Sequence, residues 1–253
     1  MKVMILAAGR GDRMRPLTDT CPKPLLPVGG KPLIVWKIES LARAGLRDIV
    51  INHAWLGEQI EAALGDGSRF GVRLSYSAET TALETAGGIA KALPLLSAHP
   101  ERGEIFLAVS GDIFCGYDFR KLLPRAHGMA GAPTPRMHLV MVPNPDFHPH
   151  GDFTLARNGL LSLDEIPADG GERLTFGNIG LYDTRLFTAI EPGTRVPMTP
   201  YYWEAIEAGS ATGERFDGRW ENVGTPSQLA ALDAAIMAPA VDAVTQVRIA
   251  RGA

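Results

Sequence analysis

Short apolar segments alternate with helical segments through the first half of the chain, and this alternation restricts the fold more than any other feature. The apolar runs lie at 3–6, 48–52, 72–76 and 105–109. Stretches with helical periodicity lie between them, at 32–44, 56–64 and 86–95. An unbroken apolar run suits a strand covered on both faces, and strand–helix alternation is typical of parallel sheets. The sequence therefore predicts a Rossmann-like α/β fold with a mostly parallel sheet and helices on both faces.

The second half of the chain has a looser pattern, which predicts that antiparallel strands join the sheet late. Asn158-Gly159 separates two alternating segments, and this is a strong signal for a β-hairpin. Further strands are expected at 137–142 and 175–182. Helices are expected at 119–126, 185–190, 200–208 and 226–237. We predict a single domain over residues 1–237, followed by a tail over 238–253.

Composition narrows the class of protein. With 253 residues, 45% of them hydrophobic, the chain can bury a substantial core. A formal net charge of −3 gives no general attraction to nucleic acid, and no stretch approaches the roughly 20 apolar residues of a membrane span. Cys21 and Cys115 lie far apart without metal-binding spacing, which suits a reducing compartment. We expect a cytoplasmic protein with small-molecule partners, no nucleic acid and no membrane, and the oligomeric state stays open, a monomer included.

The segment after the first apolar run has the features of a phosphate-binding loop. Small residues alternate there with arginines. The small residues are Ala8, Gly9 and Gly11, and the arginines are Arg10, Arg13 and Arg15. Because small residues leave the backbone uncovered, the phosphates of a ligand can approach the peptide N–H groups, and the arginines add positive charge. The pattern predicts a polyphosphate site.

Lys23 lies between two prolines, Pro22 and Pro24. Proline fixes its own φ and restricts the residue before it, so we expect an extended segment without a helix, which holds the lysine in place. The preceding Gly9-Arg10-Gly11 lacks the third glycine of the dinucleotide-binding fingerprint, and no Gly-Lys-Ser or Gly-Lys-Thr of a P-loop follows. The loop therefore matches neither of the two commonest phosphate-binding motifs.

Asp112 follows the strand expected at 105–109 and is preceded by Ser110-Gly111. Ligands of parallel sheets bind beyond the carboxyl ends of the strands, so Asp112, Asn52-His53 and the segment 79–88 should meet the phosphate-binding loop at one rim. A hard cation such as Mg²⁺ takes carboxylate oxygens together with substrate phosphates. We predict that Asp112 binds Mg²⁺, although a solvated turn aspartate would have the same sequence context.

The segment from Leu6 to Thr18, followed by Pro22-Lys23-Pro24, resembles the signature of the sugar-1-phosphate nucleotidyltransferases, L-A-A-G-x-G-T-R-L-x-P-L-T and then P-K-P. The resemblance implies a nucleotide-diphospho-sugar transferase fold, which is GT-A-like, with a nucleotide-binding part at 1–127 and a sugar-binding part at 128–237. It implies catalytic roles for Lys23, Arg13 and Asp112. The residues that it implies for nucleotide binding are Leu6, Ala8, Gly9, Gly11, Asp12, Arg13 and Lys23.

Glu84-Thr85-Ala86-Gly87-Gly88 opens an expected helix, and small residues needed to enter that helix would explain the glycines on physical grounds alone. The turn is also similar to the one with which this family reads the base, which implies that Gly87 and Gly88 face uracil. Three stretches, 52–57, 83–88 and 144–153, resemble the branch of the family that uses N-acetylmuramate 1-phosphate. That resemblance places Glu84, Asn144 and Asp152 at the amino sugar.

The segment from Trp220 to Thr225 is similar to the family's late W-x-D-x-G-T segment, with Asn222 in place of the second metal-binding aspartate. The resemblance implies that Asn222 joins Asp112 at Mg²⁺. An amide oxygen can bind Mg²⁺ but brings no charge, so metal affinity should fall or the triphosphate must supply more oxygens. The chain departs from the family's pattern at two further places that concern contacts to the sugar. Gly177-Asn178 stands where the family has Ser-Gly, and the segment 164–167 lacks the lysine of the family's E-K-P.

These features predict a Mg²⁺-dependent nucleotidyltransferase that converts UTP and N-acetylmuramate 1-phosphate to UDP-N-acetylmuramate and pyrophosphate in peptidoglycan recycling. One alternative is transfer to another sugar 1-phosphate, such as mannose or glucose 1-phosphate with GTP or dTTP. An alternative of another class is a non-catalytic regulator that binds a nucleotide sugar, and Asn222 is the feature that keeps this alternative open.

Overall fold

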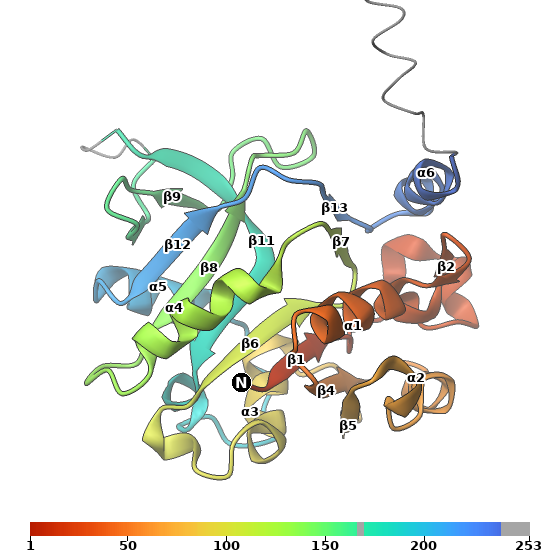
Figure 1. Cartoon of the computed structure of the whole chain (residues 1–253), viewed down its shortest axis with the longest axis horizontal. Helices are drawn as coiled ribbons and strands as arrows, with labels where there is room; N and C mark the ends of the chain where they lie inside the picture. The colour runs from red at the N-terminus through yellow and green to blue at the C-terminus, as the bar shows by residue number, and fades with distance from the viewer. Residues whose placement is uncertain (166–169, 239–253) are drawn as a thin grey trace, which may run out of the picture.

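Parallel strands form the centre of a nine-stranded sheet in the computed structural model, which describes residues 1–165 and 170–238. Strand β1 (Val3–Leu6) pairs in parallel with β4 (Asp48–His53) on one side and with β6 (Ile105–Ser110) on the other. Strand β5 (Arg73–Ala78) pairs in parallel with β4. The prediction of a parallel α/β sheet is confirmed (Figure 1).

Antiparallel strands extend the sheet beyond β6, as predicted. The long strand β11 (Glu172–Asp183) runs antiparallel to β6 and to β8 (Met137–Val142). The hairpin of β9 (Phe153–Leu155) and β10 (Leu161–Ser162) pairs with the first residues of β11. Strand β12 (Ala211–Arg215), which was not predicted, lies parallel to β8. Its Ala-Thr-Gly-Glu-Arg sequence has no apolar run, so burial against β8 rather than local pattern forms this strand.

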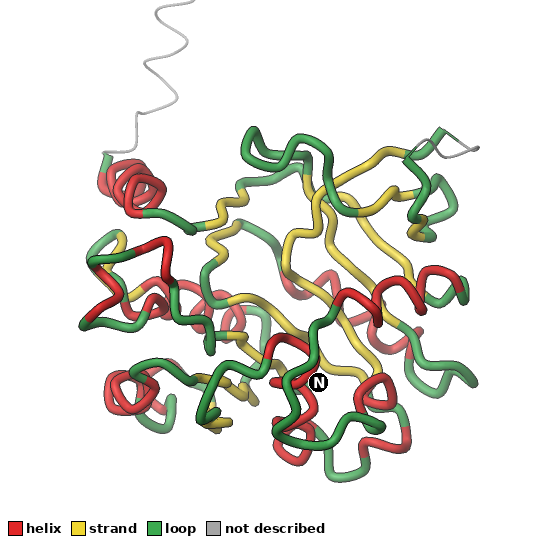
Figure 2. Tube along the Cα trace, turned by 180° about the vertical axis from the view of Figure 1, so that it is seen from behind, coloured by secondary structure: helices red, strands yellow, loops and turns green. Residues whose placement is uncertain are grey.

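Helices cover both faces of the sheet (Figures 1 and 2). Helices α1 (Leu33–Arg43), α2 (Gly57–Leu64) and α4 (Leu122–Met129) share one core with alternate strand residues such as Val3 and Ile5. On the other face, α3 (Glu84–Leu96) and α5 (Thr199–Glu207) pack against the intervening residues, such as Met4. Because successive side chains of a strand point to opposite faces, each strand supplies both cores.

A third core joins the two ends of the described chain. The closing helix α6 (Pro226–Met237) packs Leu229 and Leu232 against Met14, Leu26 and Val28 of the N-terminal loop. The backbone N–H of Gly29 also donates to Oδ1 of Asp233 at 2.7 Å. Four short strands frame this region: β2 (Pro27–Val28), β3 (Lys31–Pro32), β7 (Ile113–Cys115) and β13 (Trp220–Asn222).

The expectation that Lys23 lies in an extended segment without a helix is wrong. Lys23–Leu25 is a 3₁₀ turn, η3, with Pro22 as its extended N-cap and Pro24 inside its first turn. Prolines are compatible with a first turn, because the N–H groups there have no partner within the helix. The remaining 3₁₀ turns are η1 (Asp12–Met14), η2 (Leu17–Asp19), η4 (Ser68–Phe70), η5 (Pro100–Arg102), η6 (Phe119–Lys121) and η7 (Thr184–Phe187).

Two of the expected helices are thus altered. The helix expected at 119–126 is η6 followed by α4, and the one expected at 185–190 is the short turn η7. The tail expected at 238–253 lies outside the described residues apart from Ala238. Among the helices of residues 1–165 and 170–238, none is both long and apolar enough to cross a bilayer.

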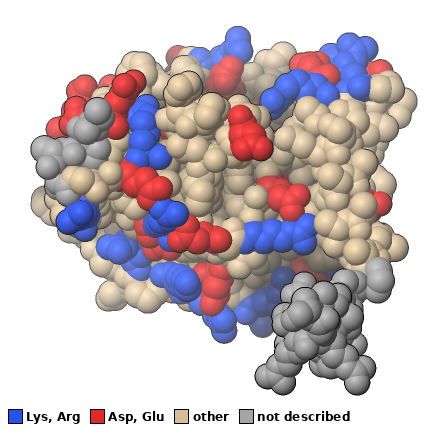
Figure 3. All heavy atoms as spheres, turned by 90° about the horizontal axis from the view of Figure 1, so that it is seen from above, with Lys and Arg blue, Asp and Glu red and all other residues tan. Residues whose placement is uncertain are grey.

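Figure 3 shows the molecule from above, and basic and acidic side chains are interspersed over the described part of the face seen there.

Candidate active site

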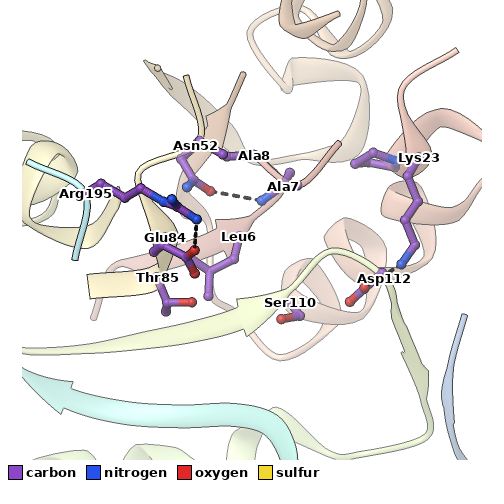
Figure 4. A pocket seen from close by; sticks show the side chains of 13 residues that line it. Leu6, Ala7, Ala8, Lys23, Asn52, Glu84, Thr85, Ser110, Asp112 and Arg195 are labelled. Carbon is purple, nitrogen blue, oxygen red and sulfur yellow. Dashed lines mark hydrogen bonds and ion pairs between the residues drawn. The ribbon is translucent and has the colours of Figure 1, made fainter. Parts of the chain in front are cut away.

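A cavity of about 380 Å³ opens at the carboxyl ends of the central strands. Leu6 of β1 pairs with Asn52 of β4 and with Ser110 of β6, so residues at the carboxyl ends of three strands lie side by side in its wall. The wall is completed by residues of the N-terminal loop, of η3, of the α3 entry, of the turn after β6 and of the loop before α5 (Figure 4). These residues are Ala7, Ala8, Gly9, Lys23, Pro24, Ala82, Glu84, Thr85, Asp112 and Arg195.

Lys23 and Asp112 face each other at one end of this cavity (Figure 4). The Lys23 Nζ donates to Oδ2 of Asp112 at 2.6 Å, although the two residues are 89 positions apart in the sequence. The side chain of Lys23 is 10% exposed and that of Asp112 is 34% exposed. An ammonium and a carboxylate therefore meet where a ligand can reach both, and the predicted phosphate-binding lysine and the predicted metal ligand share one cleft.

The N-terminal loop has a fixed shape around Lys23. Gly11 has a φ of +73°, a conformation that strongly favours glycine. A Cβ on Gly11 would approach Cβ of Lys23 to 3.2 Å and Cγ2 of Thr18 to 3.1 Å. The hydroxyl of Thr18 donates to the Gly11 carbonyl at 2.9 Å, and Trp55 Nε1 donates to the Thr18 carbonyl at 2.9 Å. The loop that borders the cavity is thus tied to the segment after β4.

The arginines of the loop differ in what they contact. The Arg10 guanidinium lies 4.2 Å from the ring centroid of Trp55, and its Nε lies 3.0 Å from Oδ1 of Asp12. Arg15 pairs with Asp19 at 2.7 Å. Arg13 is exposed, and in the described part of the chain it has no carboxylate partner. Gly11, Asp12 and Arg13 do not line the cavity, so their predicted roles in nucleotide binding remain predictions.

A buried chain of hydrogen bonds fixes the cavity wall behind the loop. Asn52 accepts from the backbone N–H of Ala7 with Oδ1 at 2.9 Å and donates from Nδ2 to Oε1 of Glu79 at 2.7 Å. Oε2 of Glu79 accepts from the backbone N–H of Leu83 at 2.8 Å. Asn52 and Glu79 are both buried. Since buried polar groups are costly when unpaired, this chain of bonds couples the end of β1 to the entry of α3.

Glu84 and Arg195 form the opposite end of the cavity (Figure 4). Arg195 Nη2 lies 2.5 Å from Oε1 of Glu84, across 111 positions of sequence. Glu84 has a φ of +63°, an uncommon conformation for a residue other than glycine and one that occurs often at ligand sites. Arg195 was not among the predicted residues, because its loop between η7 and α5 carries no motif and reaches the site through tertiary packing.

Gly87 and Gly88, which were expected to face the base, do not line the cavity. Other protein atoms fill the space that a side chain at either position would take. A Cβ on Gly87 would lie 2.2 Å from the carbonyl oxygen of Thr194, and the Gly87 N–H already donates to the Val196 carbonyl at 3.1 Å. A Cβ on Gly88 would lie 2.8 Å from Asn52 Nδ2 and from Glu79 Oε1. Both glycines are needed for close packing of α3, and Glu84 and Thr85 form the wall instead.

A second cavity, of about 590 Å³, lies beside the hairpin of β9 and β10, and Asp152 and Asn178 line it. Since Ile179 of β11 pairs with Val109 of β6, Asn178 adjoins the position of Ser110, which lines the first cavity. Tyr202 also lines the second cavity, and burial raises the pKa of its hydroxyl, so Tyr202 remains protonated at neutral pH.

Two of the residues predicted to face the sugar have contacts of a structural kind. Asn144 donates to the carbonyls of Pro149 and Arg173 and accepts from the Thr175 hydroxyl, so it joins its loop to β11 and lies outside both cavity walls. Asp152 accepts from the Phe176 N–H at 2.7 Å with Oδ2, and its Oδ1 lies 3.0 Å from Nε2 of His148. Asp152 therefore reaches the second cavity with both carboxylate oxygens already partnered.

The side chain of Asn222 has an unpartnered oxygen, and its backbone lies beside the segment that follows Asp112, although Asn222 does not line the first cavity. Asn222 pairs with Ile113 across β13 and β7, and the N–H of Val223 donates to the Asp112 carbonyl at 3.0 Å. Among the described residues, Asn222 Oδ1 is a buried polar atom without a hydrogen-bond partner. Within the same residues no group of three or more His, Cys, Asp or Glu could hold a metal. One carboxylate and one amide oxygen fit Mg²⁺, which is commonly bound by few protein ligands together with substrate phosphates.

Comparison with known sequences identifies the class of protein that this fold and site define. The nucleotidyl transferase family matches residues 2–238, and the chain belongs to that family. It is 46% identical over 230 residues to the N-acetylmuramate alpha-1-phosphate uridylyltransferase of Neisseria meningitidis serogroup B, covering 90% of this chain and 95% of that protein.

More distant relatives share the fold but differ in length or sequence. The chain is 34% identical over 192 residues to the UTP–glucose-1-phosphate uridylyltransferase of Synechocystis; the match covers 72% of this chain and 48% of that relative, so the chain spans about half of its length. A Bacillus anthracis protein crystallised with sucrose superimposes with a TM-score of 0.75 at 23% identity, covering 93% of this chain and 95% of that one. At this identity the likeness concerns the fold.

The Asn52 bonds generate a pH-dependent prediction. In Asn52→Asp a carboxylate replaces the amide that donates to Glu79, and two carboxylates at 2.7 Å cannot both stay ionised. The pKa of one of them rises in the folded state above its unfolded value of about 4. The variant therefore loses stability as the pH increases from the unfolded pKa to the raised pKa of the folded state. We expect the free energy of unfolding to drop by about 1–3 kcal/mol at neutral pH, with a smaller deficit in mild acid.

Urea denaturation at the two pH values measures this difference, with Asn158→Asp as the matched control. Asn158 is an exposed turn residue whose Oδ1 accepts from the Leu160 N–H at 3.0 Å, and an aspartate can keep that bond. A deficit of the same size at both pH values would contradict the proposed contact between Asn52 and Glu79.

Proposed function

We propose that this nucleotidyltransferase transfers UMP from UTP to N-acetylmuramate 1-phosphate and releases pyrophosphate. The observation that carries the proposal is the meeting of Lys23 and Asp112 in a cavity formed by the carboxyl ends of β1, β4 and β6. The choice of substrates is supported by the Neisseria relative, to which the chain is 46% identical.

The reaction requires alignment and charge compensation rather than covalent catalysis. An oxygen of the sugar 1-phosphate attacks the α-phosphorus of UTP, and the bond from that phosphorus to the oxygen bridging to the β-phosphate breaks. The electron pair of the broken bond leaves with pyrophosphate. Negative charge develops on the α-phosphate oxygens and on the leaving group, where fixed positive groups lower the barrier most.

Lys23 is the proposed contact for the α-phosphate and the incoming sugar phosphate. Its ammonium would exchange the 2.6 Å bond to Asp112 for phosphate oxygens, and the 3₁₀ turn of η3 keeps its stem in place. Arg13 and the backbone N–H groups of the Ala8-Gly9 loop would hold the β- and γ-phosphates. The base would lie beside Leu6 and Ala82, which form part of the cavity wall away from Lys23.

Asp112 and Asn222 are the proposed protein ligands of Mg²⁺, together with triphosphate oxygens. When bound, the ion would neutralise charge on the phosphates and orient them. Asp112 brings the one negative charge of this pair, and the unpartnered Oδ1 of Asn222 brings a neutral oxygen.

The sugar is proposed to occupy the second cavity, which adjoins the first where Asn178 lies beside the Ser110 position. We accordingly propose a nucleotide-binding part at 1–127 and a sugar-binding part at 128–237. Asp152 would face the sugar there, and Glu84 would face it from the first cavity. The proposal extends to a cytoplasmic role in peptidoglycan recycling, with small molecules as substrates.

A panel of nucleotides and sugar phosphates tests the function. We expect pyrophosphate release to be fastest with UTP and N-acetylmuramate 1-phosphate, compared with mannose or glucose 1-phosphate and with GTP or dTTP. A preference for another pair would overturn the substrate assignment. Saturable UTP binding without pyrophosphate release at any Mg²⁺ concentration and with any pair would instead favour a non-catalytic regulator.

Lys23→Met removes the ammonium and keeps most of the side-chain length. We expect kcat/KM to fall by about 100- to 1,000-fold, as when one preorganised donor to a developing charge is lost. Pyrophosphate release measures the rate, thermal unfolding checks the fold, and Lys121→Met on η6, outside the first cavity, is the control. An unchanged rate would remove Lys23 from the mechanism.

Asn222→Asp would give the proposed metal site a second carboxylate. We expect the Mg²⁺ concentration for half-maximal rate to fall by roughly tenfold, because ligand charge raises the affinity for a hard cation. Titration of the rate with Mg²⁺ measures it. Glu221→Gln is the control, since Glu221 contacts Arg219 at 2.7 Å, and this variant should leave the Mg²⁺ dependence unchanged. No shift in Asn222→Asp would place Asn222 outside the metal site.

A further inference from the structure

The second cavity has a positively charged wall at Arg173. Its charged lining residues are Arg173 and Asp152, and its other lining residues are neutral, among them Phe153, Phe176, Tyr202 and Trp203. Asp152 has both carboxylate oxygens partnered, by the Phe176 N–H and by His148. Asp152 keeps its negative charge but its hydrogen-bonding positions are occupied, and Arg173 is the residue of this wall that carries a positive charge.

The Arg173 guanidinium is held by backbone carbonyls. Nε donates to the His150 carbonyl at 2.9 Å, Nη2 to the Asp152 carbonyl at 3.1 Å, and Nη1 to the Leu163 carbonyl at 3.4 Å. These bonds fix the position of the group between the loop before β9 and the residue after β10. Carbonyl dipoles hold a cation without cancelling its charge.

No carboxylate neutralises Arg173 within residues 1–165 and 170–238. The neighbouring Glu172 pairs with Arg215, which also pairs with Asp217. A guanidinium has five N–H groups, and three of those of Arg173 are used in the bonds above. Two N–H groups of Arg173 therefore remain, and a carboxylate in a bidentate pair accepts from two.

The substrate named for the Neisseria relative is an acid, and the acid group distinguishes muramate from the neutral sugars of the other relatives. This step depends on the proposed function and on the second cavity as the sugar site. A carboxylate entering that cavity would meet Arg173 as its cationic wall residue, next to aromatic side chains that suit the apolar faces of a sugar.

We propose that Arg173 is a specificity-determining residue, which binds the carboxylate of the lactyl ether of N-acetylmuramate 1-phosphate and thereby selects this sugar over its unsubstituted counterpart. The same two N–H groups remain unpaired when N-acetylglucosamine 1-phosphate occupies the site, because that sugar lacks the acid. A site built to bind a charged group rejects analogues without it more strongly than an apolar pocket rejects a smaller ligand.

The test compares the two sugar phosphates on the same protein sample. Pyrophosphate release with UTP gives kcat/KM for N-acetylmuramate 1-phosphate and for N-acetylglucosamine 1-phosphate in the wild type, Arg173→Gln and Arg173→Lys. We expect Arg173→Gln to lower the ratio of the two values by roughly ten- to hundredfold. Arg173→Lys keeps the charge without the planar fork, so its ratio should lie in between. Arg120→Gln, at an exposed arginine of η6 that pairs with Asp118 and lies outside the cavity wall, should keep the wild-type ratio.

The ratio separates recognition from folding. Partial unfolding of Arg173→Gln would lower both rates by the same factor and leave the ratio unchanged. Calorimetric binding of UDP-N-acetylmuramate and UDP-N-acetylglucosamine to each variant repeats the comparison without turnover, and the same preferential loss is expected there.

An unchanged ratio would overturn the inference, whether both sugars lose equally in rate and in binding or neither loses at all. Arg173 would then contact the shared phosphate, only brace its loop, or take no part in binding the sugar. A wild-type enzyme that fails with N-acetylmuramate 1-phosphate but uses another sugar phosphate would overturn the proposed function and this inference together, and the wild-type measurement alone would reveal that outcome.

Discussion

Parallel hydrogen bonding of β1 to β4 on one side and to β6 on the other is the constraint on which the candidate site depends. This register puts Leu6, Asn52 and Ser110 at one level, from three segments separated by about fifty residues each in the sequence. The loops that leave these strands must then emerge together. Lys23 and Asp112 meet because each belongs to a loop of this kind, and their ion pair is a consequence of the sheet.

The sequence predicts the central fold well because buried parallel strands require unbroken apolar runs and amphipathic helices between them. It also predicts that the loop after β1 and the Asp112 turn share one rim, since ligands of such sheets bind at the carboxyl ends of strands. The hairpin at Asn158-Gly159 follows from local turn chemistry. In each case the information lies within a few consecutive residues.

Other features depend on tertiary contacts and leave no local pattern. Arg195 reaches the cavity from a loop whose sequence has no distinctive spacing, and β12 forms by pairing with β8 despite its polar composition. Gly87 and Gly88 have the composition of a ligand-facing turn, yet close packing of α3 accounts for them. Glycine content alone does not distinguish room for a ligand from room for a neighbouring backbone. The prolines around Lys23 are compatible with a 3₁₀ turn as well as with an extended segment.

The core that α6 shares with the N-terminal loop has a consequence for biosynthesis. Met14, Leu26 and Val28 bury their side chains against Leu229 and Leu232, and so the loop after β1 completes its packing with the last described helix. The loop that carries Lys23 therefore acquires its final support only after α6 has been synthesised. A nascent chain arrested before α6 would carry the Lys23 loop without the scaffold that shapes it.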